Sequence, residues 1–282
     1  MSFPRERRIH AFRRRLGYTP HMPNLERIAP GNFCWMELAT SNQSEAKKFY
    51  CGLFGWKADD NPMGPNDFYT MFKIEGRTVG AGYTLRPEMV QHGVPPHWGL
   101  YVAVESADEV TSRVGGLGGT VLAPAFDVFD AGRMAVLQDP TGASLSLWQA
   151  RSHTGFQITG VPGSFCWADL MTGDPARAEK FYSGLFGWKL DRGEKGGDYL
   201  HIKNGETYIG GIPPAGSAGP GVPSHWSIYI LVTDCDASTA KAKTLGAKVY
   251  MPPTTIEGVG RWSVIADPQR ATFSAFQPME RR

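Results

Sequence analysis

The sequence has little cysteine, little net charge and no long apolar run, and each shortage excludes a class of protein. Only 4 of its 282 residues are cysteine, and no two of them have the C-x-x-C spacing of redox or metal motifs. The formal net charge is +2, and no apolar run approaches the about 18 residues of a membrane-spanning helix. We therefore expect a cytoplasmic protein with reduced thiols and with neither a membrane nor a nucleic acid as partner.

The small net charge is unevenly distributed along the chain. Residues 1–21 contain six arginines and one glutamate, which leaves a net negative charge on the rest of the sequence. These arginines are not followed by the apolar stretch of about 7 to 15 residues that a secretory signal requires. We expect residues 1–29 to form a basic, disordered arm outside the folded part.

What the chain does contain is a long internal repeat. Residues 31–60 recur 132 positions later, as residues 163–192, with 17 of 30 positions identical. Downstream the offset becomes 128, as in His97-Trp98 and His225-Trp226. A period near 130 residues is the size of a whole domain. The repeat predicts two similar modules, at residues 30–150 and 163–282, joined by a linker at 151–162 and related by an approximate two-fold axis.

Each module is predicted to alternate strands with helices. Alternating aromatic residues at 33–38 indicate a half-buried strand, and apolar residues at 46, 49, 50 and 53 have the spacing of a helix packed on a sheet. Asn42 in the first copy and Asp174-Pro175 in the second are typical helix starts. A second helix is expected at 107–117, ended by Gly118, among strands at residues 69–74, 78–83, 98–104, near 121, 133–137 and 144–148.

Two sequence phrases connect the chain with a known family. The phrase F-Y-x-G-L-F-G-W, present twice, and the closing phrase D-P-x-G-A-x-L-x-L-W resemble the vicinal oxygen chelate superfamily of glyoxalases, bleomycin-resistance proteins and extradiol dioxygenases. The tandem arrangement and the opening W-x-[D/E]-L-x-T are similar to its two-module bacterial glyoxalase-like branch. The resemblance covers residues 30–278 and implies an α+β fold. Each module would contain two βαβββ units, whose curled mixed sheets enclose a cavity for a ligand, usually on a divalent metal.

The resemblance also shows that the family's metal ligands are missing. The three ligand positions correspond to Trp35, Gly99 and Ser146 in the first module, and to Trp167, Ser227 and Ser274 in the second. An indole and a glycine cannot ligate a metal, and a neutral hydroxyl is a poor ligand. We therefore expect no metal and no other cofactor.

Strand alternation predicts what lines each cavity instead. With Trp35 pointing inward, Phe33 and Glu37 should point inward too, as should Phe165, Trp167 and Asp169 in the second copy. The facing strands add a histidine, a tyrosine and a further aromatic residue. Such an aromatic cup suits a flat organic molecule held by stacking. The candidate ligand-binding residues are Trp35, His97, Tyr101, Arg133, Trp148, Trp167, His225, Tyr229 and Arg261, and His201, which has Met71 as its equivalent, could distinguish the two cavities.

Each candidate also has a structural interpretation. Large aromatics such as Trp35 are often core residues. His97 and His225 follow turn residues at a strand start, where a histidine often caps the turn. Glu37 and Asp169 are either general bases, because burial raises the pKa of a carboxyl group, or partners of the nearby Arg133 and Arg261.

The sequence thus predicts a protein that binds a small organic molecule in aromatic cavities without a metal. The alternative is a glyoxalase-like lyase or isomerase, in which Glu37 or Asp169 abstracts a proton and Tyr101 or His97 stabilises the enolate. A protein-interaction scaffold is a third possibility, if side chains fill the cavities. Because the two modules pair internally, we expect a monomer or a weak homodimer.

Overall fold

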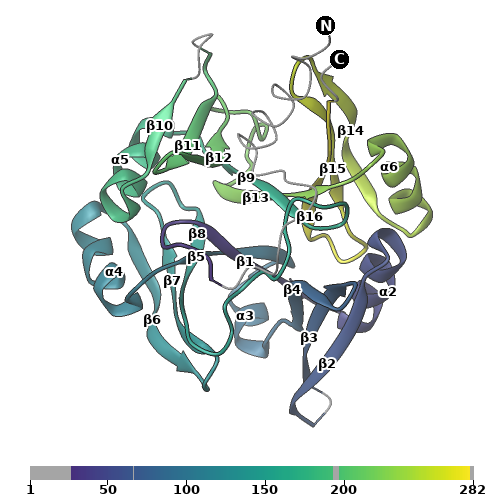
Figure 1. The fold of residues 1–282 in the computed structure, drawn as a ribbon, viewed down its shortest axis with the longest axis horizontal. Coiled ribbons are helices and arrows are strands. Elements are labelled where there is room, and N and C mark those ends of the chain that lie inside the picture. The colour runs from purple at the N-terminus through teal and green to yellow at the C-terminus, as the bar shows by residue number, and fades with distance from the viewer. Residues whose placement is uncertain (1–26, 66, 193–196, 280–282) are drawn as a thin grey trace, which may run out of the picture.

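The computed structural model describes residues 27–65, 67–192 and 197–279, so the predicted arm at 1–29 lies almost wholly outside the described residues. Each half of the chain forms an eight-stranded mixed sheet (Figure 1). The order β2-β3-β4-β1-β5-β8-β7-β6 in the first sheet is repeated as β10-β11-β12-β9-β13-β16-β15-β14 in the second. We call the two sheets with their helices module 1 and module 2. The predicted α+β fold of two tandem modules is confirmed.

Module 1 contains two βαβββ units joined by a short helix. The first unit has one more strand than the residue pattern predicted, because β2 is an exposed edge strand without an apolar face. The elements are β1 (Phe33–Thr40), α2 (Gln43–Phe54), β2 (Lys57–Gly64), β3 (Asp67–Ile74), β4 (Arg77–Thr84), α3 (Pro87–Gln91), β5 (His97–Ala103), α4 (Ala107–Val114), η1 (Gly115–Leu117), β6 (Thr120–Val128), β7 (Gly132–Gln138) and β8 (Ser144–Ala150).

Module 2 repeats this order, but lacks the short helix between its units. Its elements are β9 (Phe165–Met171), α5 (Pro175–Phe186), β10 (Lys189–Asp191), β11 (Leu200–Asn204), β12 (Thr207–Ile212), β13 (His225–Leu231), α6 (Cys235–Thr244), β14 (Lys248–Ile256), β15 (Gly260–Ala266) and β16 (Thr272–Pro278). No helix in the described ranges is long and apolar enough to cross a membrane.

The first helix of each module begins where its sequence predicts. The Asn42 side chain accepts the backbone N–H of Glu45 at 3.1 Å, and Asp174 caps α5 in the same way. Both helices end at a glycine in the left-handed conformation, Gly55 with φ 72° and Gly187 with φ 72°. A residue with a side chain is strained in that conformation, which accounts for glycine at both ends.

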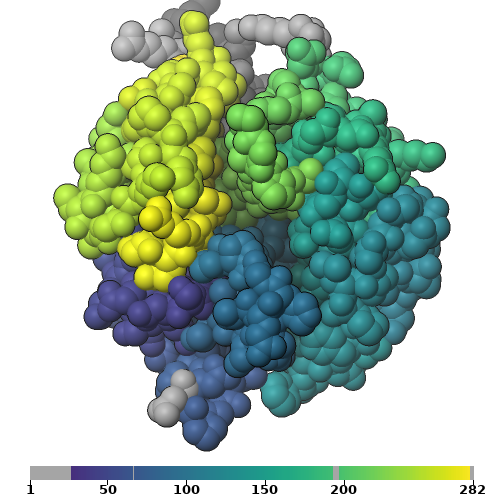
Figure 2. Space-filling model, turned by 180° about the vertical axis from the view of Figure 1, so that it is seen from behind, coloured from purple at the N-terminus to yellow at the C-terminus, as the bar shows by residue number. Residues whose placement is uncertain are grey.

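Two symmetry-related tyrosine–aspartate pairs join the modules. The Tyr50 hydroxyl on α2 donates to Asp267 of module 2 at 3.0 Å, and Trp98 donates its indole N–H to the same hydroxyl at 2.9 Å. The Tyr182 hydroxyl on α5 donates to Asp139 of module 1 at 2.9 Å. Each helix therefore packs on its own sheet and bonds to the other module. Figure 2 shows the resulting seam, with module 1 in purple to teal and module 2 in green to yellow.

Phe33 belongs to this seam and not to the cavity. Its ring lies 5.6 Å from the ring of Trp188 and 5.2 Å from that of Trp226, both in module 2. The register between β1 and β5 shifts between Phe33 and Trp35, so a β-bulge breaks the simple alternation there. Phe165 likewise packs on Phe33, at 6.1 Å between ring centroids. The expectation that Phe33 and Phe165 line the cavities is therefore wrong.

We expect the Tyr50→Phe variant to be less stable than the wild type by about 2 kcal/mol, because it leaves a buried carboxylate oxygen and a buried indole N–H without their partner. Urea unfolding followed by tryptophan fluorescence measures the difference. Tyr250→Phe is the matched control, since Tyr250 is 51% exposed. Equal stabilities of the two variants would contradict the assigned role of Tyr50.

Candidate functional site

We call the face of each sheet opposite its helices the cup of that module. In module 1 the strand registers place Trp35 beside Tyr101, Tyr101 beside Ser146, and Glu37 beside Gly99. These positions alternate with the residues that face α2 and α4, such as the fully buried Leu38. From Trp35 onward, the side chains predicted by strand alternation to face the cup therefore do so in the structure.

A carboxylate held by two tyrosines lies in the cup of module 1. Oε1 of Glu37 accepts the Tyr101 hydroxyl at 2.6 Å, and Oε2 accepts the Tyr69 hydroxyl at 2.7 Å. Trp35 in turn donates its indole N–H to the Tyr69 oxygen at 3.1 Å. We call this group of a carboxylate, two tyrosines and a tryptophan the carboxylate clamp.

Module 2 contains the same clamp with a shorter acid. Asp169 accepts the hydroxyls of Tyr199 at 2.5 Å and Tyr229 at 2.7 Å, and also the indole N–H of Trp167 at 3.0 Å. Tyr199 reaches the shorter side chain by lying over Gly211, where a Cβ atom would be 2.0 Å from its hydroxyl. Glycine at this position is thus required by the clamp.

The electrostatics of the clamp keep the hydroxyl protons on its tyrosines. Burial raises the pKa of Glu37 above its ordinary value, and the hydrogen bonds from Tyr101 and Tyr69 oppose this rise. Burial and the neighbouring carboxylate raise the pKa of both tyrosines well above their ordinary value. Burial likewise raises the pKa of Asp169, opposed by its hydrogen-bond donors. Both tyrosines therefore donate, and the carboxylate only accepts.

The two arginines predicted beside the carboxylates lie elsewhere. Arg133 forms ion pairs with Asp108 of α4 at 2.7 Å and with Asp127 at 2.9 Å. Arg261 pairs with Asp236 of α6 at 2.6 Å. Both arginines therefore lie on the helix side of their sheets, because alternation turns every second strand residue away from the cup. The predicted pairs with Glu37 and Asp169, and a place for these arginines in the cups, are wrong.

The strand-start histidines lie at the mouths of the cups. Nδ1 of His97 is 2.8 Å from the carbonyl oxygen of Pro95, and Nδ1 of His225 is 2.8 Å from that of Pro223. This is the turn-capping arrangement that the sequence left open. His97 also lies close enough to Glu37 to oppose the rise of its pKa. A structural and a ligand-binding role are thus compatible at this position.

A segment predicted as a simple linker forms part of the cup of module 1. The His153 ring lies 4.5 Å from the ring of Trp35 and 5.8 Å from that of Trp148, and Trp148 donates its N–H to the His153 carbonyl. Gly155, with φ 101°, allows this close approach, because a Cβ atom there would lie 2.3 Å from the Cys34 carbonyl oxygen. Spacing alone could not reveal this contact, since the linker has no counterpart within the repeat.

Tyr69 and Tyr199 are the main site residues that sequence reasoning missed. They occupy equivalent positions of the two copies, at the start of a predicted strand. A tyrosine at the same position in both copies was the sequence signal that could have identified them. His201, the expected difference between the cups, lies 4.8 Å from Tyr199 by ring centroids, and its Nδ1 is buried without a partner in the described residues.

The residues of the cups do not fit the family's metal. Nowhere in residues 27–65, 67–192 and 197–279 do three or more His, Cys, Asp or Glu side chains converge as a metal site would require. In module 1 both oxygens of Glu37 already accept tyrosine hydroxyls, and the indole N–H of Trp35 donates to Tyr69. The clamp therefore replaces the ligand set and does not supplement it.

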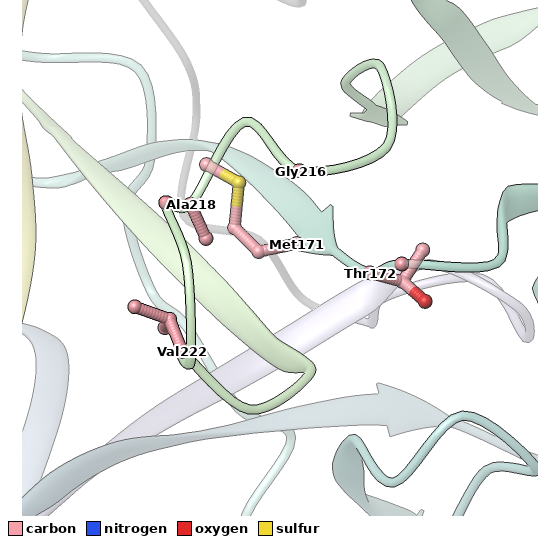
Figure 3. Close-up of a pocket in the computed structure, with 7 residues that line it drawn as sticks. Met171, Thr172, Gly216, Ala218 and Val222 are labelled. Atoms are coloured by element: carbon pink, nitrogen blue, oxygen red, sulfur yellow. The ribbon is translucent and has the colours of Figure 1, made fainter.

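A small pocket opens at the mouth of the module 2 cup. Met171, two residues beyond Asp169 on β9, faces the loop that precedes β13, close to Ala218 and Val222 (Figure 3). The pocket has a volume of about 120 Å³ and is lined by Met171, Thr172, Gly173, Gly216, Ala218, Gly219 and Val222.

The sequence profile of the Glyoxalase/Bleomycin resistance protein/Dioxygenase superfamily matches residues 32–147 and 164–274, one match in each module. The chain belongs to this superfamily. It is 41% identical over 262 residues to a protein named "Putative glyoxylase CFP32" in Mycobacterium tuberculosis, covering 91% of this chain and 98% of that protein.

Other similar proteins carry different names. The chain is 34% identical over 271 residues to the anthracycline biosynthesis protein DnrV of Streptomyces peucetius, covering 91% of this chain and 96% of that protein. Among solved structures, a Mn(II)-bound glyoxalase from Novosphingobium aromaticivorans has a TM-score of 0.61 at 14% identity, over 89% of this chain and 83% of that one. The dioxygenase LapB of Pseudomonas sp. KL28 has a TM-score of 0.59 at 14% identity, over 92% and 94% of the two chains. These structures share the fold.

The Glu37→Gln variant should differ from the wild type in how its stability depends on pH. The unfolded chain loses the Glu37 proton near the ordinary pKa of 4.5, whereas the folded protein holds it to higher pH. Wild-type stability therefore falls as pH rises through the raised pKa, and glutamine has no proton to lose. The stability of the variant minus that of the wild type should grow with pH and then level off.

Urea unfolding at a series of pH values measures this difference. Glu105→Gln is the matched control, because Glu105 is exposed and forms no ion pair in the described part of the chain. If the Glu37→Gln difference is as flat with pH as that of the control, Glu37 is not a buried acid with a raised pKa.

Proposed function

We propose that each module binds a flat organic molecule in its cup, stacked on the aromatic walls and oriented by the carboxylate clamp, without a metal. The observation that carries this proposal is the presence of the same clamp in both modules, built with different acids. In both modules the tryptophan donates to a clamp tyrosine, Trp35 to Tyr69 and Trp167 to Tyr199. Trp167 also reaches the Asp169 carboxylate. A buried carboxylate is costly to desolvate. Unlike the seam aspartates Asp139 and Asp267, Glu37 and Asp169 accept side-chain donors of their own module and do not join the two modules.

The composition of the walls supports an aromatic ligand. Trp35, Tyr101 and Trp148 are nearly fully buried and form the floor of the module 1 cup, while Tyr69 and Glu37 remain partly exposed to solvent. A ligand can therefore reach the clamp from the open side. Two similar proteins are named for anthracycline biosynthesis, which suggests fused-ring aromatic compounds as the ligand class.

We expect Trp35→Ala and Trp167→Ala each to remove about half of the binding capacity for anthraquinone, a flat fused-ring probe, because each removes the stacking surface of one cup. Glu37→Gln should bind nearly as well as the wild type. Quenching of tryptophan fluorescence and equilibrium dialysis measure the capacity. Phe129→Ala, at a 77% exposed aromatic residue, is the control. Unchanged capacity in both tryptophan variants, with folding intact, would contradict the proposal.

We also expect the purified protein to hold no stoichiometric divalent metal after loading with zinc, nickel, manganese or iron(II) and dialysis. Elemental analysis measures the content. A retained ion in a whole-number ratio would mean that a different set of residues, with Glu37 and His97 the first to examine, binds metal.

A second candidate is a lyase or isomerase in which the clamp carboxylate is a general base. The raised pKa of Glu37 favours it, because a base works best with a pKa near the working pH. Exchange of the protons next to the carbonyl of tetralone in heavy water, followed by NMR, tests this candidate. Rates that are the same in the wild type, Glu37→Gln and Asp169→Asn would exclude it.

We further propose that the protein acts as a cytoplasmic monomer. The modules already bury against each other the surfaces that a single-module protein would use in a homodimer. The contacts of Tyr50 and Tyr182 across the seam support this view.

A further inference from the structure

The mouth of the module 1 cup carries polar side chains on three neighbouring strands. Ala39 of β1 pairs with Tyr83 of β4 on one side and with His97 of β5 on the other. These residues lie two positions beyond Glu37 and its neighbours, so they face the cup as well. The small Ala39 side chain leaves room between the tyrosine and the histidine.

Arg86 adds a positive charge at the same place. It follows the buried Leu85 directly after β4 and is the N-cap residue of α3. In the described part of the chain the Arg86 guanidinium and the Tyr83 hydroxyl have no hydrogen-bond or ion-pair partner, and Glu88 does not pair with Arg86. Arg86 is exposed and lies three residues beyond Tyr83, where the chain leaves β4. Burial and the Glu37 charge raise the pKa of Tyr83, and the Arg86 charge opposes this rise.

The mouth of the module 2 cup keeps a histidine, His225, but is otherwise more apolar. Met171 takes the place of Ala39 beside His225, and β12 ends at Ile212, so no tyrosine extends the sheet there. The connection at residues 213–224 contains no charged residue. Ala218 and Val222 from this loop face Met171 across the pocket (Figure 3).

We propose that the module 1 mouth, formed by Tyr83, His97 and Arg86, binds the acidic group of an aromatic ligand, whereas module 2 accepts a neutral ligand. This inference rests on the proposed function and specifies the ligand class of each cup. An unpaired guanidinium and a phenolic hydroxyl are suitable donors for a carboxylate. The negative charge of Glu37 lies deeper and is already bound by two hydroxyls, so it does not occupy the mouth.

The test uses two probes of the same shape, naphthoic acid and naphthamide, with the full chain at low ionic strength. Calorimetric titration measures the affinity of each probe for the wild type, Arg86→Gln and Arg177→Gln. Arg86→Gln should bind naphthoate about five-fold more weakly, as expected for a rim ion pair, and naphthamide equally well. Arg177 is an exposed residue of α5, far along the chain from the module 1 mouth, and its variant should bind both probes like the wild type.

The outcomes separate this inference from the proposed function. If Arg86→Gln leaves naphthoate binding unchanged, or weakens both probes equally, the acid-binding mouth is wrong while ligand capture stands. If Arg177→Gln weakens naphthoate as much as Arg86→Gln does, the effect is one of overall charge and the inference also fails. If anthraquinone binds the wild type but naphthoate does not, the inference alone fails. If none of the three probes binds, the proposed function fails with it.

Discussion

The structure depends on a buried hydrogen bond from a tyrosine of each module to an aspartate of the other. Asp267 accepts Tyr50 on one oxygen and backbone N–H groups of its own turn on the other, so a costly buried carboxylate is fully bonded. Burial raises the pKa of Asp267, and these donors oppose the rise. One residue thus fixes a turn, a helix and the seam together, and Asp139 does the same on the other side of the pseudo-two-fold axis.

This seam leaves the cup faces free for binding. Along β5 the indole of Trp98 points to the helix side and bonds to Tyr50, while Gly99 and Tyr101 face the cup. The seam and the proposed binding sites therefore use alternate residues of the same strands. A substitution on the helix side acts on the packing of both modules, whereas a substitution on the cup side acts on one proposed binding site. This division explains how the two cups could diverge while the repeated helix phrase stayed nearly the same in both copies.

The sequence predicted the fold well because the repeat gives every element twice. It also placed Trp35, Glu37 and Tyr101 on one face of the sheet, because alternation holds between them. The sequence wrongly placed Phe33 in the cup, because a β-bulge shifts the register there. It also wrongly placed Arg133 there, because strand alternation turns this side chain to the face that packs on α4. It could not find His153, which reaches the cup through a glycine-dependent approach between distant segments. The failures thus lie where local spacing no longer determines which way a side chain points.

The two clamps show how a chain can keep one arrangement with different side chains. An aspartate is one methylene shorter than a glutamate, so its carboxylate lies closer to β9. Trp167 then bonds to the carboxylate as well as to Tyr199. The tyrosine must then move inward, which Gly211 permits and the Cβ of Ala81, the equivalent residue, would hinder. The change from Glu37 to Asp169 is therefore accompanied by the change from Ala81 to Gly211. Two coupled changes thus preserve the same kinds of donor around a buried carboxylate, as expected if the clamp orients a ligand in both modules as proposed.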